Sequence, residues 1–228
     1  MMNIALSERL NAVLETARDN TIGHKRIIDV GSDHGHLAAR AVMDGIFESA
    51  VCTDIHKGPA DKSASLMKDM SLSDKVKVYC TDGLDGVELT EDDTVVMAGL
   101  GGNNMVDIIS RVNASYDKEL LKTVTFILQP QKSIEVLREF LSQNAFAVTE
   151  ETVVQERGIY YPILVTRYTG ETYNLSLREK YYGPVLMKKF EAGEAVVSEY
   201  FIRLDSRYKI RARGDQEIGR LLEEMGND

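Results

Sequence analysis

The stretch IIDVGSDHGHLAAR, residues 27–40, places acidic side chains and glycines at the bend between an apolar strand and a helix. Gly31 permits a tight turn and a close approach of the backbone to a ligand. The dinucleotide-binding fingerprint G-x-G-x-x-G is absent, and a pyrophosphate beside Asp33 would meet like charge. S-adenosylmethionine fits better, because it has an ammonium and a sulfonium group that Asp29 and Asp33 can attract. The alternative is a simple glycine turn with surface acids.

Two further aspartates follow the next two strands. Asp54 ends AVCTDI, at about the separation expected for a carboxylate that binds the two hydroxyls of an adenosine ribose. Asp82 follows VKVYC and can accept a hydrogen bond from an adenine amino group, and Gly83 lets the backbone come close. Ligands of open α/β sheets bind at the carboxyl ends of the strands, so three acids at three successive strand ends indicate one site.

The fourth and fifth strands end in segments suited to an acceptor. VVMAGLGG ends in the loop Gly99, Leu100, Gly101 and Gly102, whose bare backbone would let a planar base approach the methyl group. A sharp turn is the alternative reason for these glycines. Gln129, Pro130 and Gln131 follow on the same edge, and their amides can hydrogen-bond an acceptor.

Short apolar runs alternate with helical patterns through the first two thirds of the chain. The runs are RIIDV, AVCTDI, VKVYC, TVVMAG and VTFILQ, and helices are expected near residues 36–47, 59–70, 104–112 and 133–143. Apolar positions from Ile4 to Ala17 recur at helical spacing, which predicts an opening helix. Strands that are apolar throughout and alternate with helices are typical of a parallel sheet in the α/β class.

Beyond the fifth strand the pattern changes. AFAVTEETVVQ and GIYYPILVTRY predict an antiparallel hairpin at the end of the sheet, and Pro162 favours an edge position or a bulge in it. Five parallel strands plus a hairpin resemble the Rossmann-like sheet of class I methyltransferases. The remainder of the chain has a helical pattern, so we expect a methyltransferase domain over 1–168 and a small helical domain over 169–228.

The 228 residues carry a formal net charge of −9, which by itself argues against a nucleic-acid partner. The segment RLDSRYKIRAR, 203–213, is a local basic patch, and Arg203, Arg207 and Arg211 would line one helix face able to follow an RNA backbone. Cys52 and Cys80 lie in strand-like runs, which favours reduced core thiols over a metal site. No segment is typical of a membrane span or a secretory signal, so we expect a cytoplasmic, monomeric protein without a metal ion.

The motifs LSERL, DVGSDHGHL, DIHKGP, TDGL, AGLGG and FILQPQ, in this order, resemble the bacterial tRNA (adenine-22-N1)-methyltransferases over about residues 6–168. The resemblance implies S-adenosylmethionine as the methyl donor, N1 of an adenosine in the D-arm of tRNA as the acceptor, and a C-terminal helical, coiled-coil-like domain that helps to bind tRNA. The chain departs from the family pattern in having His36, Leu100 and Gln131 where tyrosine, methionine and asparagine are usual.

Two groups of site residues follow from the resemblance. The cofactor is expected to contact Asp29, Gly31, Ser32, Asp33, His34, Gly35, Asp54, Ile55, Asp82 and Gly83. The catalytic, acceptor-side residues are expected to be His36, Gly99, Leu100, Gly101, Gly102, Gln129, Pro130 and Gln131.

Adenine N1 has an in-plane lone pair and needs no deprotonation, so positioning would supply most of the catalysis. A base in a helix must be extruded, and His36, Tyr160 or Tyr161 are candidates to stack on it. Two alternatives stay open: a methyltransferase that acts on a small molecule or a protein, and a non-catalytic protein that binds S-adenosylmethionine. A dehydrogenase is disfavoured by the missing fingerprint.

Overall fold

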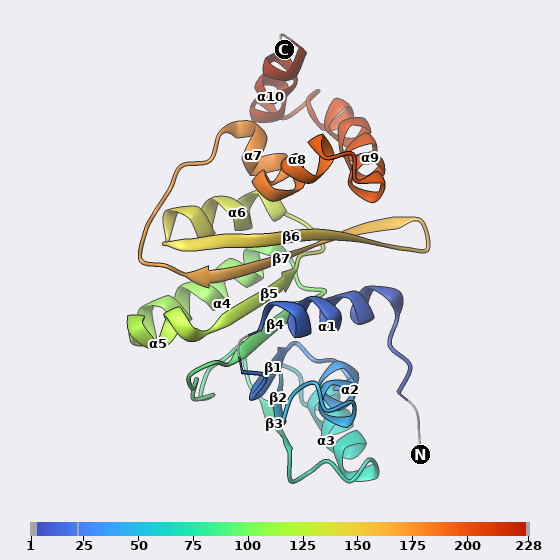
Figure 1. Ribbon diagram of the computed structural model, residues 1–228, viewed down its shortest axis with the longest axis vertical. Coiled ribbons are helices and arrows are strands. Elements are labelled where there is room, and N and C mark those ends of the chain that lie inside the picture. The colour runs from blue at the N-terminus through green and yellow to red at the C-terminus, as the bar shows by residue number, and fades with distance from the viewer. Residues whose placement is uncertain (1–3, 22, 227–228) are drawn as a thin grey trace.

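A seven-stranded mixed sheet forms the centre of the computed structural model, which describes residues 4–21 and 23–226 (Figure 1). The strands lie in the order β3-β2-β1-β4-β5-β7-β6. They are β1 Arg26–Val30, β2 Ser49–Asp54, β3 Val76–Cys80, β4 Thr94–Ala98, β5 Thr125–Gln129, β6 Phe146–Glu156 and β7 Ile159–Tyr168. The helices are α1 Glu8–Asn20, α2 His36–Met43, α3 Lys57–Asp69, α4 Gly102–Ser115, α5 Lys118–Thr123, α6 Ile134–Gln143, α7 Leu177–Tyr182, α8 Pro184–Glu191, α9 Ala195–Arg211 and α10 Gln216–Gly226.

The first five strands are parallel and β7 runs antiparallel between β5 and β6. Asp29 of β1 lies opposite Cys52 of β2 and Val96 of β4, so the ends of the central strands meet at one edge. Each strand begins and ends within one residue of its predicted limits. The predicted α/β class, with parallel strands, a terminal hairpin and C-terminal helices, is confirmed.

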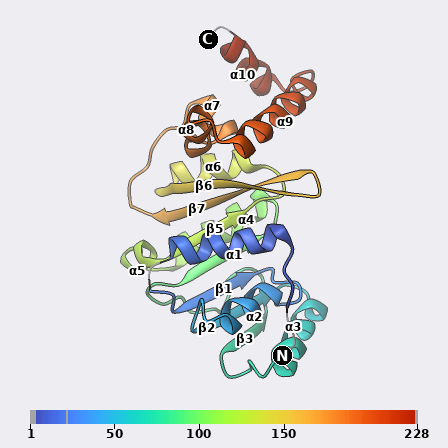
Figure 2. The same ribbon diagram turned by 45° about the vertical axis from the view of Figure 1, so that its right-hand side comes forward.

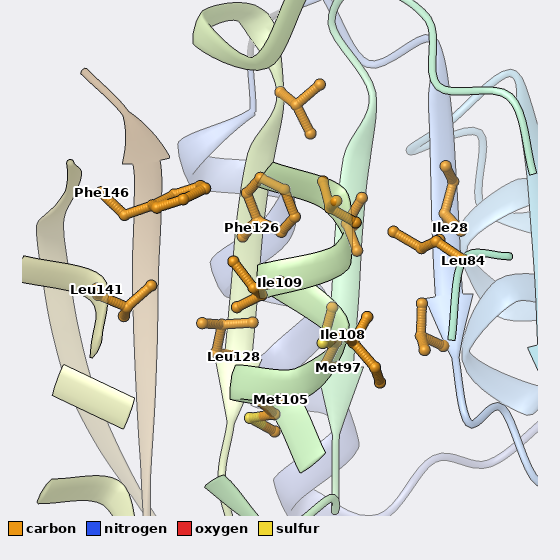
Figure 3. Close-up of a cluster of buried hydrophobic side chains, with 14 of the residues drawn as sticks. Ile28, Leu84, Met97, Met105, Ile108, Ile109, Phe126, Leu128, Leu141 and Phe146 are labelled. Carbon is orange, nitrogen blue, oxygen red and sulfur yellow. The ribbon is translucent and has the colours of Figure 1, made fainter. Parts of the chain in front are cut away.

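Helices cover both faces of the sheet, and successive residues of one strand enter different cores. Ile28 belongs to the core under α4 and α6, where Met105, Ile109 and Leu141 are packed against the sheet (Figure 3). Ile27, the preceding residue, belongs to the core under α1 and α2. Figure 2 shows α1 passing over the sheet beside β4 and β5, where it brings its first turn toward the carboxyl edge.

The opening helix is shorter than expected. It begins at Glu8, where the Ser7 hydroxyl accepts a hydrogen bond from the Leu10 N–H, as is usual at an N-cap. Ile4 and Leu6 precede the helix, although both contact the apolar core. The apolar spacing therefore predicted correctly which side chains pack in the core, but the helix begins later than it indicated.

One expectation for the sheet holds only locally, and another is wrong. β7 is an interior strand, but its pairing with β5 ends at Leu164, so Pro162 pairs only with Val153 of β6 and occupies a local edge position, as its missing N–H requires. The irregularity of the hairpin lies in β6, between Val148 and Glu150. Cys80 is exposed at the end of the edge strand β3, whereas Cys52 in β2 is buried as predicted.

The four C-terminal helices share an apolar cluster that includes Tyr182, Leu186, Phe201 and Leu204, and lie beside β6 and α6 (Figure 1). They surround the buried ion pair of Arg138 and Glu151, described below. The division into domains at residue 168 stays a prediction. Within the described residues, no helix has the length and apolar character needed to cross a membrane.

Candidate functional site

A cavity of about 700 Å³ opens at the carboxyl ends of β1, β2 and β3. Its walls combine apolar and acidic side chains. Ile55, whose side chain is 59% exposed, lies on one side and Leu100 and Ile108 on the other, with Asp54 and Asp82 at the same cavity. A large apolar side chain exposed in a cavity offers a surface to a planar ring, and the carboxylates offer acceptors to its polar edge.

Asp54 is held in place by the loops around it. Its Oδ1 accepts a hydrogen bond from the His56 N–H at 2.9 Å, and its Oδ2 accepts one from the Asp33 N–H at 3.3 Å. Asp33 has a left-handed backbone, with φ of 53°, which is uncommon for a residue other than glycine. The β1–α2 loop is thus fastened to the end of β2, and each carboxylate oxygen of Asp54 keeps a second lone pair for a ligand hydroxyl.

Asp82 is less buried and has a cationic partner. The Arg111 Nη1 lies 2.9 Å from Asp82 Oδ2 and 3.5 Å from Asp85 Oδ2. The hydrogen bond from Arg111 lowers the pKa of Asp82, so this carboxylate stays ionised. Gly83 next to it has φ of 60°, and a methyl group there would lie 2.9 Å from Ile108, so glycine fits this turn best.

Asp29 is the buried acid of the site, with only 5% of its surface exposed. Burial, together with a smaller contribution from the charge of Asp54, raises its pKa to about 7 against the effect of the Ala38 backbone amide. A second cavity of about 120 Å³ adjoins it, lined by Ser32, Asp33 and His34 among others. A positive ligand group placed there would favour the charged form of Asp29.

Gly31 lines both cavities, so one ligand can extend from the larger into the smaller. Its φ is 71°, and a methyl group on it would lie 3.2 Å from the Leu100 side chain. Gly35 is equally crowded, since a methyl group would lie 2.8 Å from Met67 in α3. These glycines keep the path between the two cavities open and the first turn of α2 close to α3.

The acceptor loop, residues 99–102, is joined to the loop after β5. Gly99, Gln131 and Gly102 donate backbone hydrogen bonds to the carbonyls of Gln129, Leu100 and Lys132, at 3.0, 2.8 and 2.8 Å. A methyl group on Gly102 would lie 2.2 Å from the Ser133 carbonyl oxygen. The contact between two backbone segments therefore excludes a side chain at Gly102. The exposed Gly99, in contrast, faces the edge where a base can approach.

The three residues after β5 are placed differently from one another. Gln129 is fully buried, and its Oε1 accepts a hydrogen bond from Arg9 Nη1 at 2.6 Å while its Nε2 donates to the Pro130 carbonyl at 3.0 Å. Pro130 is buried and Gln131 is exposed. Both ends of the Gln129 amide are thus used in hydrogen bonds within the protein, contrary to the expectation that Gln129 contacts the acceptor. The exposed amide of Gln131 can make that contact.

Arg9 was not among the predicted site residues. It lies in the first turn of α1, far from the strand ends in sequence, and its guanidinium lies 5.7 Å from the centre of the Tyr161 ring. It also lines the smaller cavity together with His36, which is exposed at the start of α2 with its ring 5.8 Å from that of His34. The motif LSERL contains Arg9, but only the fold shows which strands α1 crosses.

The three arginines of the basic patch do not act alike. Arg207 and Arg211 line a groove of about 300 Å³ that also contains Lys132, Tyr160 and Tyr161. Arg211 is bound by Glu135 at 3.4 Å and by Asp215 at 3.4 Å, so part of its charge is neutralised. Arg203 is exposed one turn earlier in α9 and does not line this groove. No group of three or more potential metal ligands occurs in the part of the chain that the structure describes.

The sequence profile of the family TrmK, tRNA (adenine(22)-N(1))-methyltransferase, matches residues 27–213. The chain belongs to this family. The TrmK-family enzyme of Bacillus subtilis, a tRNA (adenine(22)-N(1))-methyltransferase, is 30% identical over 165 residues, which cover 72% of this chain and 66% of the relative. A Mycoplasma pneumoniae protein is 35% identical over 166 residues, or 72% of this chain and 73% of that protein. The resemblance seen in the sequence is confirmed.

Solved structures of the TrmK family share the fold over nearly the whole chain. The B. subtilis TrmK structure aligns with a TM-score of 0.78 at 24% identity, covering 98% of this chain and 97% of the other. A Streptococcus pneumoniae protein in complex with S-adenosyl-L-methionine aligns with a TM-score of 0.77 at 25% identity, covering 96% and 100%. The C-terminal helices therefore belong to the shared architecture.

Proposed function

We propose that this chain methylates N1 of adenosine 22 in tRNA and that the carboxyl edge of its sheet binds S-adenosylmethionine as the methyl donor. Membership of the TrmK family supports the reaction. The observation that supports the site is the pair of connected cavities, one with apolar walls and ribose-binding acids, the other beside the buried Asp29. This donor set suits an adenosine joined to an amino acid and does not suit a pyrophosphate.

Within this proposal, the larger cavity holds the adenosine part of the cofactor. Asp54 accepts hydrogen bonds from the ribose hydroxyls, Asp82 accepts one from the adenine amino group, and Ile55 packs on the ring. Asp29 and Asp33, near the smaller cavity, attract the ammonium group, and Ser32, His34 and Gly35 shape its wall. When bound, S-adenosylmethionine supplies an electrophilic methyl group.

The chain's own part in the reaction is to position the acceptor. Adenine N1 attacks with a lone pair that lies in the ring plane, so no general base is required. Gly99 leaves room at the edge, Gln131 is exposed beside it, and Leu100 of the same loop lines the larger cavity. A base taken out of its stack is stabilised by aromatic contacts, for which Tyr161 and His36 lie at the smaller cavity's side of the edge.

The groove between the sheet and α9 is our candidate for the tRNA backbone. It continues from the loop after β5, and Arg207 and Arg211 line it with Tyr160. Phosphate contacts supply much of the affinity for RNA and make it sensitive to salt. Arg203, outside this groove, extends the basic face of α9. A monomeric state and a cytoplasmic location also stay predictions.

The test is methyl transfer from labelled S-adenosylmethionine to unmodified tRNA, with the nucleoside product identified by mass spectrometry. We expect N1-methyladenosine at position 22 and no transfer to tRNA with guanosine there. Asp54→Ala should weaken cofactor binding about tenfold or more, since it removes hydrogen bonds to a charged acceptor. Asp61→Ala, at an exposed carboxylate paired with Lys57, is the matched control.

Each failure has a separate meaning. Transfer to a small molecule or a protein, but to no tRNA, would reject the assigned acceptor. Cofactor binding without any transfer would favour a binding protein. Unchanged cofactor affinity in Asp54→Ala would reject the assignment of the cavity.

A further inference from the structure

Two cations bracket the acceptor loop, one at each end. A methyl group placed on Gly99 would lie 3.6 Å from Arg9 Nη1, and one placed on Gly101 would lie 3.2 Å from Lys132 Cε. The cations come from different parts of the chain, Arg9 from α1 and Lys132 from the loop after β5. No motif links them, and the fold alone brings them to one loop.

These two cations differ from Arg111 on the same edge. Arg111 is bound by two carboxylates, whereas the guanidinium of Arg9 contacts an amide oxygen and an aromatic ring. Glu156 accepts a hydrogen bond from the backbone N–H of Arg9, at 3.2 Å, and not from its side chain. Among the described residues, neither Arg9 nor Lys132 forms an ion pair with a carboxylate within 4.0 Å.

Their surroundings point to an anionic partner that comes from outside. The edge of the sheet holds Asp29, Asp33, Asp54 and Asp82, and the whole chain has a net charge of −9, so a polyanion would be repelled over most of this surface. Gln129 fixes the Arg9 side chain by accepting one of its hydrogen bonds, and the guanidinium has five N–H groups in all. The remaining donors suit the paired oxygens of a phosphate.

The two cations lie near glycines that are close together in the chain. Gly99 and Gly101 are two residues apart, so their Cα atoms are separated by at most about 7.6 Å. We expect a base that enters over Gly99 to bring its two flanking phosphates toward the two ends of this short loop.

We propose that Arg9 and Lys132 bind the two phosphates that flank the target adenosine, and thereby hold the extruded nucleotide over the acceptor loop. This inference rests on the proposed function, because it takes tRNA as the substrate. It makes both cations positioning residues, which act on the backbone of the nucleotide and not on the reacting atoms.

The experiment uses full-length tRNA ligated from synthetic pieces, with an uncharged methylphosphonate in place of either phosphate that flanks adenosine 22. We expect each replacement to lower kcat/KM of the wild-type protein by about tenfold or more, as for loss of a charge-assisted hydrogen bond. Arg9→Gln should show the same loss with normal tRNA and no further loss with one of the two modified tRNAs. Lys132→Gln should do so with the other.

Three controls separate this role from a structural one. Arg18→Gln changes an exposed arginine in the last turn of the same helix and should behave as the wild type does. Arg9→Gln leaves the buried Gln129 Oε1 without its donor, so the melting temperature should fall, but the affinity for S-adenosylmethionine should change far less than kcat/KM with tRNA. Arg9→Lys keeps the charge and should restore part of the loss, together with the sensitivity to the modified phosphate.

Equal sensitivity of wild type and both variants to the modified phosphates would overturn the proposal, because the phosphates would then be bound elsewhere. Loss of cofactor affinity in Arg9→Gln would also overturn it in favour of a role for Arg9 in supporting the site through Gln129. If the wild-type protein makes no N1-methyladenosine in normal tRNA, the proposed function fails instead.

Discussion

Glu151 and Asp29 are both buried, and their surroundings are opposite. Glu151 in β6 is 0% exposed, and Arg138 donates to its Oε1 at 2.8 Å while the N–H groups of Val185 and Leu186 donate to its Oε2. Asp29 in β1 is 5% exposed, and no cation among the described residues offsets its burial, so its pKa is raised to about 7. Glu151 therefore has its cation and its hydrogen-bond donors within the chain, whereas a positive ligand group would supply the cation for Asp29.

The two regions differ in whether the chain itself offsets the free-energy cost of burying a charge. Where it does, the fold is stabilised, and where it does not, a ligand can offset that cost. At the junction of β6 and the C-terminal helices, burial of charge is offset by hydrogen bonds from three elements. At the carboxyl edge, burial of Asp29 is left unbalanced, and a positive ligand group would recover that free energy. A buried acid without a cationic partner is therefore a better sign of a binding site here than a buried ion pair.

The largest effect should come from breaking the satisfied pair. Arg138→Met removes the cation and leaves Glu151 charged in a dry site, which should lower the free energy of unfolding by about 3–5 kcal/mol. Urea denaturation at pH 7.5 measures it. Lys122→Met, at the exposed pair with Glu119, is the matched control and should change stability by less than about 1 kcal/mol. A loss under 1 kcal/mol in Arg138→Met would mean that the junction does not depend on the pair.

The next effect has the opposite sign. A raised folded-state pKa means that Asp29 favours the folded state less and less as pH rises from about 4 to 7. Asp29→Asn removes this dependence and should raise the free energy of unfolding by roughly 2–4 kcal/mol at pH 8, with little change near pH 4. The same variant should lose affinity for S-adenosylmethionine. Urea titrations at both pH values and calorimetry of cofactor binding check this, and a less stable variant at pH 8 would contradict it.

Much of the fold could be predicted from the sequence because its signals are local. The five apolar runs and the hairpin gave strand limits within one residue, and the glycines after β1 and β4 marked where loops approach a ligand or one another. Whether a residue of an edge strand is covered depends on elements that lie far from it in the sequence. The exposure of Cys80 was therefore not predicted. The edge position expected at Pro162 exists only because β7 extends past the end of its neighbour β5, and the length of β5 relative to β7 is not encoded near Pro162.

The candidate site was predictable where its residues follow strands, and less so where side chains compete for partners. Asp29, Asp54 and Asp82 lie at the cavities because parallel strands bring their ends together. Arg9 arrives from a helix that crosses the sheet, and it engages Gln129, which sequence reasoning had assigned to the acceptor. Their pairing depends on tertiary packing, which no spacing rule contains.

A third substitution tests the backbone contact between the loops after β4 and β5 at the carboxyl edge. Gly102→Ala places a methyl group against the Ser133 carbonyl at the edge, and overpacking of this kind costs about 1–3 kcal/mol. We expect that loss in urea denaturation together with a loss of methyl transfer, because the loops after β4 and β5 must separate. Gly219→Ala, in a part of α10 with open space around it, should not destabilise the protein. Full activity in Gly102→Ala would show that the two loops can separate without harm.

The smallest effect should come from the exposed ion pair at the edge. Arg111→Gln removes the partner of Asp82, and both side chains are at least 41% exposed, so the free energy of unfolding should change by less than about 1 kcal/mol. The pKa of Asp82 should rise toward its ordinary value, which NMR titration of the carboxyl group can follow. A stability loss as large as that of Arg138→Met would remove the contrast between the two regions.

The position of Glu151 in the chain also bears on how the protein is made. Arg138 and Glu151 leave the ribosome together, but the amides of Val185 and Leu186 come up to 35 residues later, which is about 2–7 s at ordinary rates of synthesis. Until then, the face of the nascent sheet that the last helices will cover displays a hydrated ion pair among its apolar groups. Charged residues oppose aggregation of incomplete chains. We expect the pair to keep that face charged during translation, until α7 and α8 cover it.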